Sequence, residues 1–112
     1  MQFTPEEEED FWPLYEEYTE DLYETFEARN KALHRFNLNF ENMSDKKADE
    51  IWKEYLKYQK ELLVLQKTYY EKFKEILPTA KAVRYFQMEN KIEMMINAKL
   101  SDKIPLLEPK VQ

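Results

Sequence analysis

Apolar side chains recur at alternating intervals of three and four residues along the middle of the chain, and neither proline nor glycine interrupts them. The residues of this seam are Ile51, Tyr55, Tyr58, Leu62, Leu65, Tyr69, Phe73 and Ile76. This spacing places them on one face of a helix, which we expect over residues 45–77. A helix of that length is about 45 Å long, so its apolar stripe needs a partner of similar length.

A second long helix is predicted upstream, over residues 5–38. Thr4 can cap it, Pro5 suits the first helical position, and Glu7 completes a capping box. Its seam contains Phe11, Tyr15, Tyr18, Leu22, Phe26, Leu33, Phe36 and Phe40, with Arg29 in the slot between Phe26 and Leu33. Pro13 lies inside this seam and cannot donate a backbone hydrogen bond, so we expect a kink or a restart there.

The two seams are joined by a short polar segment. Asn37, Asn39 and Asn42 can adopt the left-handed backbone that glycine usually provides, and this chain has no glycine. Ser44 or Asp45 can cap the next helix. Because the connection is short, we predict a long antiparallel helical hairpin.

A third helix is predicted over residues 79–102. Leu77-Pro78 should end the second helix and begin this one, because the residue before a proline is driven away from helical angles. Its apolar face is too broad for one partner helix, which favours packing across the hairpin or against another chain. Ile104, Leu106 and Leu107 follow as an apolar tail that we expect to dock. The prediction is a single all-α domain over residues 1–112.

Charge is distributed unevenly along the chain. The first 28 residues hold eleven acids and no lysine or arginine, whereas the remainder holds twelve acids against all seventeen bases. No basic face is dense enough for nucleic-acid binding, which we therefore exclude as a function. No apolar run approaches the length of a membrane-spanning helix, so no span is predicted. The start at MQFTPEEEE fits a protein whose leader has been removed.

The residue types offer little for catalysis. His34 is the single histidine, and no cysteine is present to complete a metal site. The lack of glycine excludes the usual phosphate-binding loops, and Ser44 and Ser101 stand beside expected helix ends, where capping accounts for them. We predict a protein that is not an enzyme, with no catalytic residue, cofactor or metal ligand.

Four polar residues, Arg84, Gln87, Glu89 and Asn90, lie among the apolar residues of the third helix. We expect them to form a structural network that sets the register of the helix, because buried polar groups normally have partners. A functional role would require a cleft nearby. The methionines of this helix are either core filler or an adaptable surface for apolar clients, since methionine repacks easily.

Three stretches carry a family resemblance: FTPEEEEDFWPLYEEY, MSDKKADE, and ILPTAKAVRYFQMENKI followed by IPLL. Over nearly the whole chain they resemble a family of small, secreted, largely uncharacterised bacterial helical proteins. More distantly, Phe3-Thr4-Pro5-Glu6-Glu7 is similar to the Leu-Thr-x-x-Gln motif of the Spy/CpxP group, with Leu77-Pro78-Thr79 in the place of a second copy. Here Glu7 stands where that motif has glutamine. The group is periplasmic and forms cradle-shaped hairpin dimers that act as chaperones or as accessory sensors of envelope stress.

The resemblance implies a periplasmic or secreted binding protein, chaperone-like or accessory to an envelope-stress sensor. We expect partners to be proteins: a second copy in a homodimer, and unfolded clients or a sensor. The residues expected to contact them are Phe11, Tyr15, Tyr18, Phe86, Met88, Met94 and Met95. Two alternatives stay open. The stripes could form a dry dimer interface in a purely structural module, or acids together with His34 could make a metal-responsive accessory protein.

Overall fold

The computed structural model describes residues 2–108, and this part of the chain is built from helices without strands. In order these are α1 (Pro5–Asn39), the short 3-10 helix η1 (Phe40–Asn42), α2 (Asp45–Ile76) and α3 (Thr79–Ser101). The all-α prediction is confirmed. Among the described residues, no helix combines the length and the apolar character that crossing a bilayer requires.

Local signals determine where the helices begin. The Thr4 hydroxyl accepts a hydrogen bond from the Glu7 amide at 3.2 Å, and the Ser44 hydroxyl accepts one from the Lys47 amide at 3.1 Å. Both are N-caps of the ordinary kind. The helices begin at the expected residues and end within one residue of the expected positions. Helix α1 continues through Pro13 without a break, so the restart proposed there is wrong.

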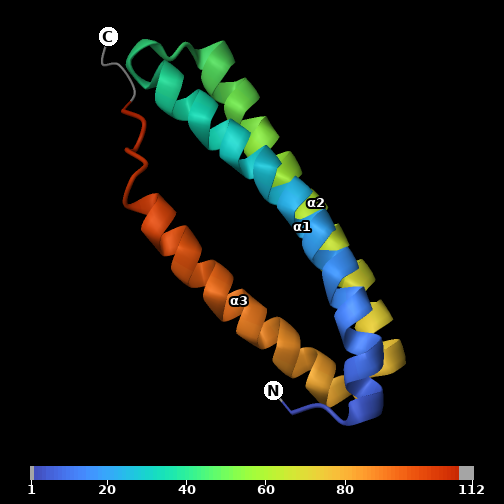
Figure 1. Ribbon diagram of the computed structural model, residues 1–112. Coiled ribbons are helices and arrows are strands. Elements are labelled where there is room, and N and C mark those ends of the chain that lie inside the picture. The colour runs from blue at the N-terminus through green and yellow to red at the C-terminus, as the bar shows by residue number, and fades with distance from the viewer. Residues whose placement is uncertain (1, 109–112) are drawn as a thin grey trace.

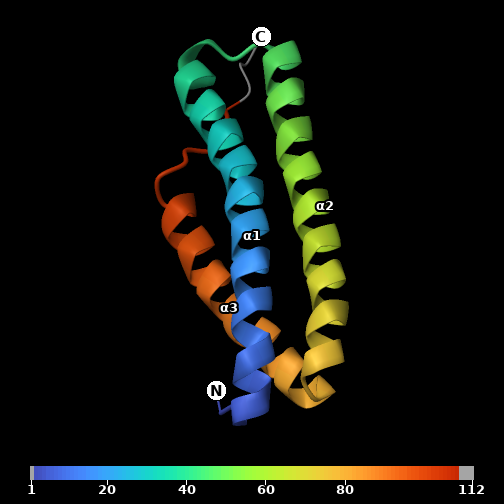
Figure 2. The ribbon, with the colours of Figure 1, turned by 45° about the vertical axis from the view of Figure 1, so that its right-hand side comes forward.

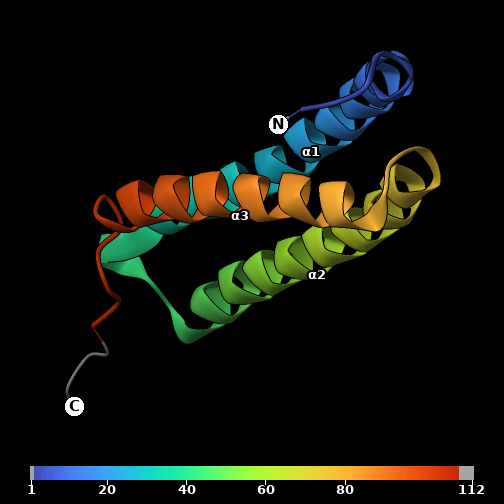
Figure 3. The ribbon, with the colours of Figure 1, turned by 90° about the horizontal axis from the view of Figure 1, so that it is seen from below.

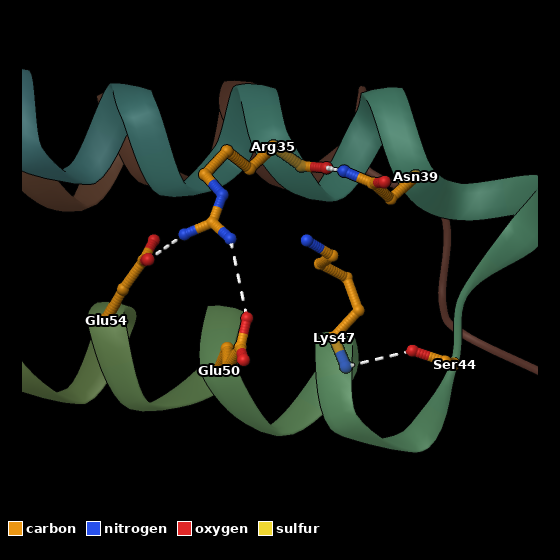
Figure 4. Close-up of polar contacts among 6 residues, drawn as sticks. All are labelled: Arg35, Asn39, Ser44, Lys47, Glu50 and Glu54. Carbon is orange, nitrogen blue, oxygen red and sulfur yellow. Dashed lines mark hydrogen bonds and ion pairs between the residues drawn. The ribbon is translucent and has the colours of Figure 1, made fainter.

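The turn between α1 and α2 is made without left-handed backbone. No described residue has a positive φ, so the expected left-handed asparagines are a wrong prediction. Instead, the short η1 helix tightens the end of α1, and extended Met43 and Ser44 lead into α2. Arg35 joins the two helices beside this turn through Glu54 and, at 3.8 Å, Glu50 (Figure 4).

Helices α1 and α2 run antiparallel, side by side (Figures 1 and 2). Arg35 near the end of α1 meets the beginning of α2, while Tyr69 near the end of α2 donates to the Asp21 carboxylate at 2.6 Å. Helix α3 lies on one face of this hairpin, over the line along which α1 and α2 meet (Figures 1 and 3). The molecule is elongated, with extents of 64 × 21 × 18 Å.

The main core lies at the end of the hairpin where α2 passes into α3. Phe73 is fully buried there, with its ring centroid 5.0 Å from that of Tyr85 and 5.5 Å from that of Phe11. The tilted rings are typical of packed aromatic side chains. The buried members of this core are Phe11, Tyr18, Leu22, Tyr69, Phe73, Leu77, Ala82 and Tyr85.

Away from this core, α3 separates from the hairpin (Figure 1). Its beginning is held by Lys81, whose ammonium lies 2.7 and 2.8 Å from the two carboxylate oxygens of Glu7. Towards its other end, Ile92, Met94, Met95 and Ile96 are exposed. The apolar face of α3 is therefore covered only near the junction with α2.

The tail after α3 docks less than expected. Ile104 is half-buried, but Leu106 is 88% exposed and Leu107 is 41% exposed. The prediction that all three dock is wrong for Leu106 and Leu107, which are both exposed. These residues instead border the open space between the hairpin and the end of α3.

Candidate functional site

A cavity of about 600 Å³ opens where α3 separates from the hairpin. We call it the apolar groove. Its walls come from α1, α2, the end of α3 and the tail, and its lining residues are Arg29, Ala32, Leu33, Phe36, Ala48, Ile51, Trp52, Tyr55, Asn97, Leu100, Ser101, Ile104, Pro105, Leu106 and Leu107. The volume is within the range of about 300–1,000 Å³ that is usual for ligand pockets.

Small side chains and the direction of α3 together leave this space open. Ala32 on α1 and Ala48 on α2 line the groove, where larger residues would fill it. Trp52 also lines it and is 59% exposed, an unusual amount for so large an apolar side chain. The groove is therefore an accessible apolar surface on an otherwise charged protein.

Arg29 is the single charged residue among those that line the groove. It is 8% exposed and is the one buried charged side chain of the described chain. Its Nη1 donates to Asn97 Oδ1 at 3.4 Å, and its Nε and Nη2 donate to Asn30 Oδ1 at 3.3 and 3.4 Å. Its Cζ lies 4.7 Å from the centroid of the Phe26 ring. All of these partners are neutral.

A smaller cavity of about 270 Å³ lies between α2 and α3, and Tyr58, Glu93 and Asn97 are among its lining residues. Burial raises the pKa of the Glu93 carboxyl, and the positive charge of Arg29 partly offsets that effect. Burial also raises the pKa of Tyr58, again with an opposing contribution from Arg29. Arg29 therefore influences both cavities, although no ion pair within residues 2–108 includes it.

The second polar feature inside the fold is a contact between α1 and α3. The Tyr18 hydroxyl donates to both carboxylate oxygens of Glu89, at 2.9 and 3.0 Å. Burial raises the pKa of Glu89 to about 7; the hydrogen bond from Tyr18 lowers it, and the neighbouring Glu93 raises it further. Burial, together with Glu89, also raises the pKa of Tyr18. A carboxyl group that titrates near neutral pH thus joins the first and third helices.

The residues expected to contact partners fall into three groups, which are buried, half-buried and exposed. Phe11 and Tyr18 are buried in the core, so their placement on a contact surface is wrong. Tyr15 and Phe86 pack half-buried against the same core. The three methionines are exposed, with exposed fractions of 45% for Met88, 62% for Met94 and 65% for Met95. The periodicity of α1 identified its buried face, and the structure shows that α3 covers this face near the junction.

The predicted polar network on α3 does not form as one unit. Glu89 is bonded to Tyr18 of α1, but Arg84 and Gln87 are exposed. Asn90 is also exposed, and its amide lies 3.7 Å from the sulfur of Met94. Glu89 points towards the hairpin, whereas the other three residues lie on the solvent side of the helix. The network prediction is wrong except for Glu89.

Two observations bear on the metal-responsive alternative. His34 is exposed, and among residues 2–108 no three acidic or histidine side chains come together in a group that could hold a metal ion. A metal-responsive role therefore has no donor cluster to which we could assign it in this part of the chain.

The sequence alone did not identify the groove. Its one usable signal was Arg29, which occupies an apolar slot in the seam of α1 and proves to be buried. The separation of α3 from the hairpin has no local signal, because it depends on packing at the far end of the helix.

Comparison with family profiles, curated proteins and solved structures finds no match to this chain.

Proposed function

We propose that this chain is a non-enzymatic extracytoplasmic binding protein, chaperone-like or accessory to envelope stress, that buries apolar groups of a client protein. The observation that carries this proposal is the open apolar groove, together with the apolar residues of α3 that stay exposed. Contiguous apolar surface of this kind typically marks an interaction site. The extracytoplasmic location rests on the resemblance alone.

The mechanism is the reversible burial of apolar surface. A client side chain that leaves water gains about 25 cal/mol per Å² of buried apolar area, without requiring directional contacts. Met94 and Met95 are exposed on α3 and can repack around clients of different shape, because the thioether chain is flexible and polarizable. Binding would thus be broad in specificity.

The test is the aggregation of heat-unfolded citrate synthase, followed by light scattering with and without this protein. We expect suppression at near-stoichiometric ratio, and loss of much of it in the double variant Met94→Gln, Met95→Gln. The matched control is Tyr23→Gln with Val64→Gln, two large side chains that are 68% and 56% exposed on α1 and α2. Equal suppression by both double variants, or no suppression by the wild-type protein, would refute the proposal.

A second candidate is a dimeric interaction module in which the exposed residues of α3 meet a second copy. The same exposure of Ile92, Met94 and Met95 favours it. Light scattering of the purified protein separates the two candidates. A stable dimer that the methionine variant converts to a monomer, with no effect on citrate synthase, would favour the module over the client-binding protein.

A further inference from the structure

Arg29 is a buried cation that forms no ion pair within residues 2–108. Its three hydrogen bonds and its aromatic contact are all made to neutral groups. The Glu93 carboxyl and the Tyr58 hydroxyl also feel its charge, which lowers the pKa of both, but Glu93 is not within ion-pair distance. A guanidinium group has five N–H donors, so a donor on each terminal nitrogen remains beyond those bonds. Burying a charge is costly unless it is paired, and arginine is rarely buried without a carboxylate or phosphate. Because the hydrogen bonds of this guanidinium group all go to neutral groups, it can accept an anion that enters the groove.

The groove that reaches Arg29 is otherwise apolar. Leu33, Phe36 and Ile51 contribute its hairpin walls, and Leu100 and Ile104 contribute the wall from α3 and the tail. At a rise of about 1.5 Å per residue, Phe36 lies about 10 Å along α1 from Arg29. A ligand that fills this space has one charged end and an apolar body of about that length or more.

We propose that the apolar groove binds a fatty acid, with its carboxylate on the Arg29 guanidinium and its acyl chain running towards the hairpin turn beneath the tail. A single basic residue suits a monoanion, and the planar guanidinium suits the two oxygens of a carboxylate. A peptide fits less well, because its backbone N–H and C=O groups need partners. The polar residues of the lining are limited to Arg29, Tyr55, Asn97 and Ser101. This inference rests on the proposed function in that both use the groove as a binding surface.

Binding is measured through Trp52, which lines the groove. The chain has two tryptophans, so the full-length Trp12→Phe variant makes Trp52 the sole reporter. Three probes share one alkyl chain and are used below their micellar concentrations: dodecanoate, dodecanol and dodecyltrimethylammonium. The protein has a net charge of −6, so non-specific electrostatics favours the cationic probe and opposes the result that we expect.

We expect dodecanoate to shift the Trp52 emission and to bind about tenfold or more tightly than dodecanol, because hydrogen bonds to charged groups are among the stronger ones. The preference should disappear in Arg29→Gln. The preference for dodecanoate should persist in Arg35→Gln. Arg35 is the second arginine of α1; it faces α2 but does not line the groove. Dodecyltrimethylammonium should bind least well of the three.

The three probes with the wild-type protein test the fatty acid site even if Arg29→Gln fails to fold. Equal affinity for dodecanoate and dodecanol, or preference for the cation, would overturn the carboxylate assignment while leaving an apolar groove for clients. Absence of a Trp52 response to any probe would overturn the fatty acid site, and the citrate synthase assay would then judge client binding by itself. A preference for dodecanoate that Arg29→Gln retains would overturn the role of Arg29.

Discussion

Replacing Glu89 by glutamine should stabilise the protein at neutral pH and weaken the dependence of its stability on pH. Glu89 is the half-buried carboxyl group whose two oxygens share the hydrogen bond donated by the Tyr18 hydroxyl. A glutamine at this position still offers Tyr18 a carbonyl oxygen of similar size. The substitution therefore removes the negative charge and keeps the contact between α1 and α3.

The sign follows from the raised pKa of this carboxyl group. Burial raises the pKa of Glu89 from 4.5 to about 7, so between these values the folded protein holds a proton that the unfolded chain has lost. Stability must then fall as pH rises through this window, and the loss is complete above about pH 7. At 1.36 kcal/mol per pKa unit the full effect is at most about 3 kcal/mol. The raised pKa of Glu93 adds a loss of the same sign.

Urea unfolding followed by circular dichroism at pH 5 and pH 8 measures the effect. Wild-type protein should lose stability between these pH values, and Glu89→Gln should lose about 1–3 kcal/mol less. Glu75→Gln, at an exposed position on α2, is the matched control and should leave the pH dependence as it is. If Glu89→Gln and the wild-type protein show the same loss of stability between pH 5 and pH 8, the reasoning about burial is refuted.

Three further substitutions test the core, the N-cap of α1 and the exposure of the tail. Phe73→Ala, at a side chain that is 0% exposed, should cost about 3–5 kcal/mol in urea unfolding, and a cost below about 1 kcal/mol would contradict the assigned core. Thr4→Ala should cost about 1 kcal/mol in thermal unfolding through the lost N-cap, whereas Thr4→Ser should be close to neutral. Leu106→Ser, at a residue that is 88% exposed, should change stability by less than about 0.5 kcal/mol, and a larger loss would show that the tail packs in solution.

The sequence predicted those parts of the fold that depend on neighbouring residues. Thr4, Ser44 and Pro78 mark the helix beginnings, because a cap or a proline acts on the turn next to it. The three- and four-residue spacing likewise identified Tyr58 and Phe73 as inward-facing, since periodicity reports one face of one helix.

Contacts between distant residues could not be predicted in this way. Tyr18 and Glu89 are 71 positions apart, and neither carries a local sign of the other. Periodicity also says that a face is apolar without saying what covers it. Tyr18 and Met94 were therefore predicted to share one surface, whereas the structure buries the first and exposes the second. The groove depends on the direction of α3, which the packing of Ala82 and Tyr85 determines.

Helix α3 is a long arm whose buried apolar contacts lie at one end. Its 23 residues span about 35 Å, and the buried contacts of Leu77, Ala82 and Tyr85 lie at its beginning. By simple leverage, a rotation of about 10° at that end moves the other end by about 6 Å, comparable with half the width of a helix. The aperture of the groove is thus controlled from the opposite end of the molecule. We expect substitutions around Tyr85 to alter what the groove admits without touching anything that enters it.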